Sequence, residues 1–434
     1  MSFFGKLNSI PIVVQWLKLS NSSSNMKSSF TVSLSLFIPI AIAAILPSPV
    51  HYEKTAVLAK RASCTPASAG DAGIDDVPAI EASIASCGKG GTIIIPAGLT
   101  YTIRSILDFT GCEGCIFNIE GTLKASDDLD FWEGKTAIMH MSGINTATIQ
   151  SVAGTGVIDG NGQAAYDKFA VNSSYARPTL HYIDELSSHI AIRNLKVKNP
   201  PNVFFSVTGG SSNIAYSDLT MTAASKSTYA PKNTDGFDIG ASTYVSLTNI
   251  TVSNQDDCVA FKPGCNYASV RSITCVGSHG LSIGSLGKTN TDTVTNVYVQ
   301  SATMINATKA VGIKVYPGGA AHGTSVVSNV TFDGVIVENC DYAAQIQSCY
   351  GETAAYCDSN PSTASITDVY FKNFQGETST ESAPVVANLD CPEAGTCEVY
   401  FEGWDVEAGS GTAEYLCANI DGSPGIACSE GASG

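Results

Sequence analysis

Three aspartates and one histidine recur at nearly equal intervals in the middle of the chain. Asp235 lies in the stretch NTDGFDIG, Asp256 and Asp257 lie in NQDDCVAFKPG, and His279 lies in GSHGLSIGSLG. The intervals from Asp235 to Asp256 and from Asp257 to His279 are 21 and 22 residues. Charged groups held close together shift one another's pKa values, which prepares them to give and take protons. The pattern therefore indicates acid–base chemistry, in a sequence of which only 14% is charged.

A simpler explanation exists for each aspartate alone, because Asp is a common turn former in stretches such as NTDG and NQDD. The regular spacing of all three with a histidine favours function. We expect no metal and no cofactor, since no Cys-x-x-Cys pair is matched by a second pair or by histidines at ligand spacing. The net charge of −16 also argues against a nucleic-acid partner.

Short repeated segments surround these residues and indicate the elements that position them. Each has a polar turn, an alternating apolar strand, an Asn or Asp near a bend, and a second short strand. The copies are SSHIAIRNLKV, SSNIAYSDLTM, STYVSLTNITV, VTNVYVQSATM, VSNVTFDGVIV and ITDVYFKNFQG. Steps of 24, 31, 52, 33 and 39 residues separate their first apolar positions, which are Ile190, Ile214, Val245, Val297, Val330 and Val369. The step of 52 contains a looser copy, ASVRSITCVGS, and counts as two coils.

Units of this size cannot bury an apolar face alone, but stacked units can. Strand-like alternation excludes helical solenoids, no leucine-rich frame is sustained, and most steps are too short for a propeller blade. The best fit is all-β: a single-domain right-handed parallel β-helix of about ten coils over residues 62–434. Asp76–Cys87, DVPAIEASIASC, predicts a short N-terminal capping helix. Neighbouring coils lie about 4.8 Å apart, so the aspartates and His279 would line one face.

The N-terminal region has the layout of a secretory leader. Residues 30–46, FTVSLSLFIPIAIAAIL, form a run of 17 uncharged residues that follows Lys27. A single-pass membrane anchor is the alternative, because 17 residues is the lower limit for a span. We assign residues 1–46 to an extension plus leader, with Met26 as an alternative start. Residues 47–61 would be a pro-segment that ends at the dibasic pair Lys60-Arg61.

The number and the positions of the cysteines are consistent with export of the protein. All 14 follow Arg61, and an even number in an exported chain predicts disulfides. The close pairs Cys391–Cys397 and Cys417–Cys428 are expected to close short loops. CEGC at residues 112–115 has redox spacing but lacks a strand–helix context for that role. Glycosylation sequons begin at Asn172, Asn249, Asn306 and Asn329.

The blocks NTD, QDDC, SHG and GIK resemble, in order and spacing, the four signature blocks of glycoside hydrolase family 28, the polygalacturonase family. The resemblance covers nearly the whole chain after Arg61 and includes GVIDGNGQ at residues 156–163. It implies a right-handed parallel β-helix that hydrolyses the galacturonan backbone of pectin with inversion. It also implies that Asp256 is the general acid, and that Asp235 and Asp257 hold and activate the water.

The same resemblance implies further roles. His279 would tune the acid or bind the saccharide, and Lys314 of GIKVYPGG would bind a galacturonate carboxylate. Asn233 and Tyr342 match substrate-binding positions, and a disulfide Cys258–Cys275 would brace the strand after the aspartate pair. A simple surface charge is the alternative for Lys314, and ordinary packing is the alternative for Tyr342.

The chemistry of inversion fits these carboxylates. One protonated carboxyl must reach the leaving oxygen and another must hold water on the opposite face, with the two roughly 6.5–9.5 Å apart. Asp256 and Asp235, one to two coils apart, suit that requirement. The adjacent charge of Asp257 is expected to raise the pKa of Asp256 and help it act as an acid.

One position departs from the family pattern, because Gly312 stands where arginine usually precedes Ile-Lys. Its absence argues against bare homogalacturonan as substrate and would leave room beside the sugar; the alternative is that glycine merely suits a tight bend. GSHGLSIGSLGK, ATKAVGIKVYPGG and the ending SEGASG most resemble endo-xylogalacturonan hydrolases, which accept a backbone carrying xylose on O3. Exo-polygalacturonases are the runner-up, and rhamnogalacturonan hydrolases fit less well.

A β-helix also suits other classes of protein. A calcium-dependent pectin lyase, a phage-type adhesin and a non-catalytic pectin-binding protein are the alternatives, and the presence of all three aspartates favours the hydrolase. The sequence therefore predicts a secreted, monomeric glycoside hydrolase that acts on pectic galacturonan, xylosylated by preference.

Overall fold

The computed structural model describes residues 61–434, which all belong to one structural unit. The predicted leader in residues 1–46, the alternative start at Met26 and the predicted pro-segment up to Lys60 lie outside the described residues. Within the described part, no helix has the length and apolar character needed to cross a membrane.

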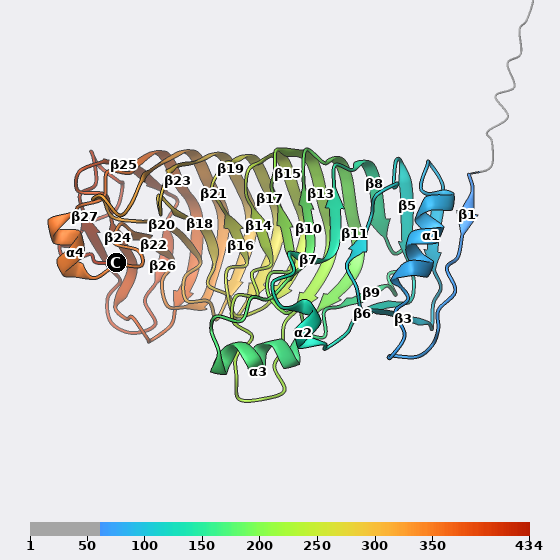
Figure 1. Ribbon diagram of the computed structural model, residues 1–434. Helices are drawn as coiled ribbons and strands as arrows, with labels where there is room; N and C mark the ends of the chain where they lie inside the picture. The colour runs from blue at the N-terminus through green and yellow to red at the C-terminus, as the bar shows by residue number, and fades with distance from the viewer. Residues whose placement is uncertain (1–60) are drawn as a thin grey trace, which may run out of the picture. The chain divides into compact units, whose positions relative to one another are not determined.

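Two sheets of parallel strands run along this unit, and the chain passes back and forth between them (Figure 1). The sixteen strands of the first sheet are β1 (Ser63–Cys64), β2 (Thr92–Ile95), β3 (Thr100–Ile103), β5 (Cys115–Ile119), β6 (Thr122–Ala125), β8 (Asn145–Gln150), β9 (Val157–Asp159), β11 (Ser188–Lys198), β13 (Ser211–Thr222), β15 (Ser242–Ser253), β17 (Cys265–Val276), β19 (Thr291–Ile305), β21 (Thr324–Cys340), β23 (Ser365–Thr378), β25 (Thr396–Glu402) and β26 (Asp405–Glu407).

The second sheet adds one strand with each turn of the chain and carries the site described below. Its eleven strands are β4 (Leu107–Asp108), β7 (Ala137–Ser142), β10 (Thr179–Asp184), β12 (Phe205–Val207), β14 (Phe237–Ile239), β16 (Val259–Phe261), β18 (Leu281–Leu286), β20 (Val311–Val315), β22 (Ala344–Gln347), β24 (Val385–Asp390) and β27 (Glu414–Ala418). Eleven strands agree with the prediction of about ten coils.

The predicted repeats stack in register on neighbouring strands of the first sheet. Ile190 pairs with Ile214, and Ile214 pairs with Val245. Val245 then pairs with Ala268, which pairs with Val297. Ala268 belongs to the looser repeat, so the 52-residue step does contain two coils. The parallel β-helix predicted from the repeats is confirmed.

The long strands of the first sheet bend where the repeats carry Asn or Asp. Asn194, Asp218 and Asn249 lie in the middle of β11, β13 and β15, with φ of 55°, 54° and 55°. Asn and Asp tolerate this left-handed conformation because their short polar side chains can form local hydrogen bonds. Each bend divides one long strand into two segments, as the repeats predicted.

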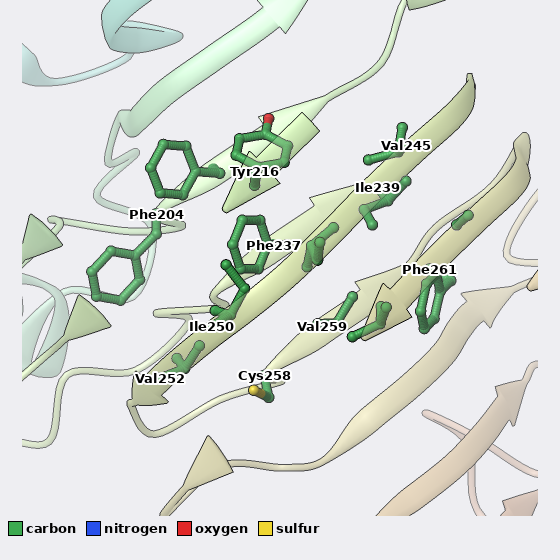
Figure 2. Close-up of a cluster of buried hydrophobic side chains, with 14 of the residues drawn as sticks. Phe204, Tyr216, Phe237, Ile239, Val245, Ile250, Val252, Cys258, Val259 and Phe261 are labelled. Atoms are coloured by element: carbon green, nitrogen blue, oxygen red, sulfur yellow. The ribbon is translucent and has the colours of Figure 1, made fainter. Parts of the chain in front are cut away.

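Apolar side chains that repeat from coil to coil fill the interior of the stack (Figure 2). Phe237 and Ile239 of β14, like Val259 and Phe261 of β16, are buried. Phe205 of β12 stacks on Phe237 with ring centroids 5.4 Å apart. Burial of this apolar surface is the main stabilising contribution, at about 25 cal/mol per Å². Because side chains alternate along a strand, the residues between these face outward.

Helix α1 (Val77–Cys87) lies at the N-terminal end of the stack (Figure 1). Its apolar face is buried in the core, and Pro78 lies in its first turn, where a missing N–H costs little. The disulfide Cys64–Cys87 joins the helix to β1. The capping helix predicted at Asp76–Cys87 is confirmed, with Asp76 as its N-cap residue. The other helices are α2 (Leu129–Trp132), α3 (Gln163–Val171) and α4 (Ala354–Ser359).

Six disulfides form in the described part of the chain, and three of them were predicted. The pairs are Cys64–Cys87, Cys112–Cys115, Cys258–Cys275, Cys349–Cys357, Cys391–Cys397 and Cys417–Cys428. The expectation that all 14 cysteines pair is wrong, because Cys265 and Cys340 are free and buried. They belong to β17 and β21, which β19 separates. Two strand spacings amount to about 9.6 Å, beyond the roughly 7 Å that a disulfide can span.

The side chains of the four predicted sequons, Asn172, Asn249, Asn306 and Asn329, are exposed. Exposure is what attachment of a glycan requires, and glycosylation itself stays a prediction.

Candidate active site

The predicted catalytic residues occupy equivalent places on successive strands of the second sheet. Asp235, Asp257 and His279 each come two residues before the start of a strand, namely β14, β16 and β18. These three strands pair in parallel, and their first residues are in register. Asp256 comes one residue before Asp257. The structure therefore brings together the four residues that the spacing singled out.

Short side chains on the outer face of the second sheet make room for this charged layer. Ser282 of β18 is in register with Gly312 of β20, and both are buried. Ser282 Oγ donates a hydrogen bond to Asp257 Oδ1 at 2.7 Å. The side chain of Lys309 covers Gly312. Long charged side chains can lie against the sheet here because the residues beneath them are small.

Asp256 faces the outer surface with two polar neighbours. His279 Nδ1 lies 3.3 Å from Asp256 Oδ1. The backbone N–H of Asn233 donates to Asp256 Oδ2 at 3.2 Å, and its side-chain amide lies 3.4 Å from the same oxygen. The Asp256 side chain keeps 18% of its surface exposed and His279 keeps 42%. Of the three aspartates, Asp256 is therefore the one best placed to meet a bound polymer.

The pKa of Asp256 differs from the sequence expectation. Burial alone would raise this pKa, but the hydrogen bond and charge of His279, the backbone N–H of Asp257 and the charge of Lys314 lower it to about 2. The expected rise in the pKa is therefore wrong for the protein without bound sugar. The physical reason is first His279, whose hydrogen bond and charge favour the ionised carboxylate, and then Lys314, whose Nζ lies 2.7 Å from Asp257 Oδ2 and offsets part of that aspartate's charge.

Asp257 and Lys314 form a buried ion pair. Their side chains are only 2% and 9% exposed. The ammonium of Lys314 also lies 5.5 Å from the ring centroid of Tyr350. Burial excludes the alternative that Lys314 is a simple surface charge. Its binding of a substrate carboxylate stays a prediction, because Asp257 already holds its ammonium.

Asp235 lies in a second carboxylate–lysine group, which the sequence reasoning missed. Lys262 Nζ lies 3.5 Å from Asp235 Oδ2 and 3.5 Å from Asp238 Oδ1. Burial, followed by the charge of Asp238, raises the pKa of Asp235 well above its ordinary value. The signal for Asp238 was present, because in NTDGFDIG it lies between two core residues of β14 and must face outward.

Arg177 supports the site from outside the sheet. Its guanidinium lies 3.6 Å from the ring centroid of Phe169 and donates to Asn233 Oδ1 at 2.8 Å. It also donates to the backbone carbonyl of Lys232 at 2.7 Å. Arg177 thus fixes Asn233 against Asp256, and it lies far from the signature blocks in the sequence, so no pattern could reveal it.

Gly312 is placed differently from the sequence expectation, and substrate binding by Tyr342 stays a prediction. A Cβ added at Gly312 would lie 2.6 Å from both Cδ and Cε of Lys309. The expectation of open space beside Gly312 is therefore wrong, because Lys309 fills it. Lys309 was missed although it comes two residues before β20, the same place that His279 takes before β18. Tyr342 comes two residues before β22 and is half-buried.

Asp256, Asp257 and His279 form the one group in the described chain that could hold a metal ion. Ligand atoms of Asp256, Asp257 and His279 all lie within 4.8 Å of one another. The Lys314 ammonium is already in contact with Asp257, and a divalent cation there would meet its positive charge. The donor set therefore suits protein cations and bound sugar better than a metal.

Comparison with known proteins defines the class. The model of the family described as "Glycosyl hydrolases family 28" matches residues 87–429. The chain belongs to glycoside hydrolase family 28, whose members act on the galacturonan of pectin, and it is a hydrolase of the polygalacturonase type. The resemblance that the blocks NTD, QDDC, SHG and GIK predicted is confirmed.

Individual members of the family differ in how similar they are to this chain. The chain is 53% identical to endo-xylogalacturonan hydrolase A of Aspergillus tubingensis over 402 residues, which cover 93% of this chain and 99% of that protein. The crystal structure of the endo-xylogalacturonan hydrolase from the same organism matches with a TM-score of 0.85 and 55% identity, covering 86% of this chain and 100% of that one. A polygalacturonase from Erwinia carotovora has a TM-score of 0.63 at 19% identity, covering 83% and 96%, and shares the fold.

Proposed function

We propose that this protein is an inverting endo-hydrolase that cleaves α-1,4-galacturonosyl linkages in xylogalacturonan. The observation that carries the proposal is the grouping of Asp235, Asp256 and Asp257 with His279 on one face of a β-helix. The xylosylated substrate is supported by 53% identity to a protein named endo-xylogalacturonan hydrolase A.

In the proposed reaction, Asp256 gives a proton to the leaving glycosidic oxygen. Asp235 and Asp257 hold a water molecule on the opposite face of the sugar ring and accept its proton as it attacks the anomeric carbon. The bond to the leaving oxygen breaks as the bond to water forms, so the configuration at that carbon inverts. Asp256 is accessible enough to meet the leaving oxygen, whereas Asp235 and Asp257 are buried and paired with lysines.

Bound substrate changes the protonation of Asp256. A pKa of about 2 leaves this carboxyl mostly ionised in the free protein at mildly acidic pH. A bound galacturonan chain excludes water from the carboxyl and brings its own negative charge, and both effects raise the pKa of a carboxylic acid. Asp256 therefore takes up its proton with the substrate, from solvent or from His279, whose Nδ1 lies 3.3 Å away.

Substrate choice is proposed to depend on the charged layer around Gly312. Without arginine at this position, the protein lacks a planar, bidentate partner for a galacturonate carboxylate. Bare galacturonan loses that contact, whereas a xylosylated chain gains contacts through its branches.

The test compares kcat/KM on xylosylated and bare galacturonan. We expect a higher value on the xylosylated polymer and a mixture of oligomers early in the digest. Equal values, with monogalacturonate as the first product, would instead support an exo-polygalacturonase. Ultraviolet absorbance from an unsaturated product would support a lyase, and binding without release of reducing ends would support a binding protein.

We also propose that the protein is secreted and acts as a monomer. Six disulfides in the described residues and four exposed sequons suit an oxidising, extracellular location. Mass analysis of the protein from culture medium tests the mature N-terminus, the glycans and the oligomeric state.

A further inference from the structure

Lys309 is a buried cation next to the proposed catalytic carboxylates that lies outside the four blocks NTD, QDDC, SHG and GIK and has no role in the proposed mechanism. Its side chain is only 5% exposed. Its ammonium makes no hydrogen bond and no ion pair with the residues of the described chain, and it is not fully enclosed by protein atoms. A lysine is almost never buried without a partner, because taking its charge out of water is costly. The partner of Lys309 is therefore to be sought outside the protein.

The position of Lys309 places it in the catalytic row. It comes two residues before β20, as His279 comes two residues before β18, and β18 and β20 pair in register. Its Cδ and Cε lie against the backbone of Gly312 on the outer face of β20. Lys314 lies two residues beyond Gly312 on the same strand face. The two lysines are thus neighbours on the surface where the substrate binds.

The charges around Lys309 favour an anionic ligand. Burial lowers the pKa of Lys309 to about 8, the charges of Asp257 and Asp256 oppose this effect, and the charge of Lys314 adds to it. The ion pair with Lys314 already uses one oxygen of Asp257, and Ser282 uses the other. An anion placed between Lys309 and Lys314 would offset the repulsion between two lysines that the protein's own carboxylates do not fully balance.

We propose that Lys309 binds a galacturonate carboxylate and sets the specificity of the enzyme for the acidic form of its polymer. This inference rests on the proposed function, which supplies the carboxylate. Gly312 is then a glycine because the stem of Lys309 needs its space. Lys309, from the preceding turn, then offers a single ammonium to the carboxylate, where a protein with arginine at position 312 would offer a planar, bidentate group.

The test measures binding rather than turnover. Wild-type Lys309 and Lys309→Met are compared in an Asp256→Asn background, so that the substrate stays intact. The probes are xylosylated galacturonan oligomers with free carboxylates and the same oligomers fully methyl-esterified. We expect Lys309→Met to weaken binding of the acidic oligomer about 10-fold or more, the scale of a hydrogen bond to a charged group. Binding of the ester should change little, and Lys309→Arg should keep part of the preference.

Two further variants separate this role from a structural one. Lys196→Met removes an exposed lysine from β11 in the first sheet and should leave both affinities unchanged. Gly312→Ala should weaken binding of the acidic oligomer while Lys309 is still present, because the new Cβ would displace its stem. Thermal unfolding of each variant confirms that it is folded.

Equal losses for the acidic and esterified oligomers, or no loss for either, would overturn the proposal for Lys309. Failure of the proposed function appears elsewhere, as the absence of reducing ends when the wild-type enzyme meets xylogalacturonan. The two failures are therefore distinguishable.

Discussion

At the scale of single residues, the site consists of carboxylates whose surroundings differ. Asp256 is partly exposed and next to His279, Asp257 is buried against Lys314, and Asp235 shares Lys262 with a second carboxylate. The pKa of Asp256 is lowered while that of Asp235 is raised. Groups whose pKa values are pushed apart can divide the roles of acid and base. In the free protein the order is the opposite of what the reaction needs, because the proposed acid Asp256 has the lowered pKa and the proposed base Asp235 has the raised one.

Replacement of the proposed acid is the first prediction at this scale. Asp256→Asn should lower kcat on xylogalacturonan by at least about 100-fold, because general acid catalysis contributes roughly 10² to 10⁴ in rate. The amide should leave binding of the polymer nearly unchanged. Asp358→Asn, at an exposed position of α4, is the control and should keep full activity. More than a tenth of the wild-type rate in Asp256→Asn would remove this residue from the role of acid.

The second prediction concerns the pH dependence of the acid. His279 lowers the pKa of Asp256, and His279→Ala removes both its hydrogen bond and its charge, so the pKa of Asp256 should rise. Activity needs protonated Asp256 and is lost as pH rises through this pKa. The alkaline limb of the kcat profile should therefore move to higher pH, whatever happens to the maximum rate. A limb that stays in place or moves to lower pH would contradict the pairing.

The sequence could predict which residues gather at the candidate site but only some of their partners. A spacing of about one coil separates the residues of the candidate site, and this spacing can be read from a single sequence. The residues are Asp235, Asp256, Asp257 and His279. Asp238 and Lys309 follow the same geometric rules, one by alternation along a strand and the other by its place before β20, and could have been found. Their contacts with Lys262 and Gly312 could not, because they depend on how side chains settle between coils.

At the scale of elements, the site depends on the strict register of short strands. The strands β14 and β16 are each only three residues long and hold the turns that carry Asp235 and Asp257 in place through buried Phe237 and Phe261. The disulfide Cys258–Cys275 joins the turn after Asp257 to the end of β17 in the same coil. The sequence predicted these elements well because alternation and bend residues are local signals. It overestimated disulfides because pairing depends on which strands become neighbours.

A buried histidine in the aromatic stack gives the third prediction. The ring centroids of His181 of β10 and Phe205 lie 5.6 Å apart, and neither ring nitrogen of His181 has a hydrogen-bond partner among residues 61–434. Burial lowers the pKa of His181 from 6.5 to about 3. The unfolded chain therefore binds a proton that the folded protein cannot, and stability is lost as pH falls below about 6.5 towards 3.

His181→Phe should remove this loss. We expect the Tm of the wild type to fall more steeply than that of the variant between neutral pH and pH 4, with the two measured by thermal unfolding. The comparison of slopes does not depend on any constant cost of fitting the larger ring. Parallel curves would show that His181 does not titrate on unfolding in this range.

At the scale of the whole molecule, the same β-helix could support hydrolysis or metal-assisted elimination, and the two differ in their need for cations. The fourth prediction is that dialysis against a chelator leaves activity on xylogalacturonan unchanged. Calcium binds through six to eight oxygens, whereas the one candidate cluster in the described residues brings together only Asp256, Asp257 and His279, and Lys314 already contacts Asp257 there. Activity that disappears with the chelator and returns with calcium would contradict a metal-free hydrolase.

The stack as a whole was predictable from the sequence because each coil must bury an apolar face against its neighbours. Seven apolar positions from Ile190 to Val369 lie in register on neighbouring strands and bury this face in the same way. The proposed substrate preference is harder to predict, because we attribute it to the lysines and aspartates that lie over Ser282 and Gly312. A family resemblance places these residues, but their protonation depends on distances between side chains, which the blocks do not give: His279, Asp257 and Lys314 lower the pKa of Asp256 although all three lie in the blocks.

Inversion at the anomeric carbon is the central claim, and proton NMR of the first products tests it most directly. Wild-type enzyme is mixed with xylogalacturonan at a pH where mutarotation is slow, and the anomeric signals of the new reducing ends are followed from the start. Attack by water held at Asp235 and Asp257, opposite to a leaving oxygen protonated by Asp256, predicts that the β-anomer appears first and the α-anomer follows by mutarotation. Initial appearance of the α-anomer would contradict the account. Formation of an unsaturated sugar, by elimination instead of addition of water, would contradict it as well.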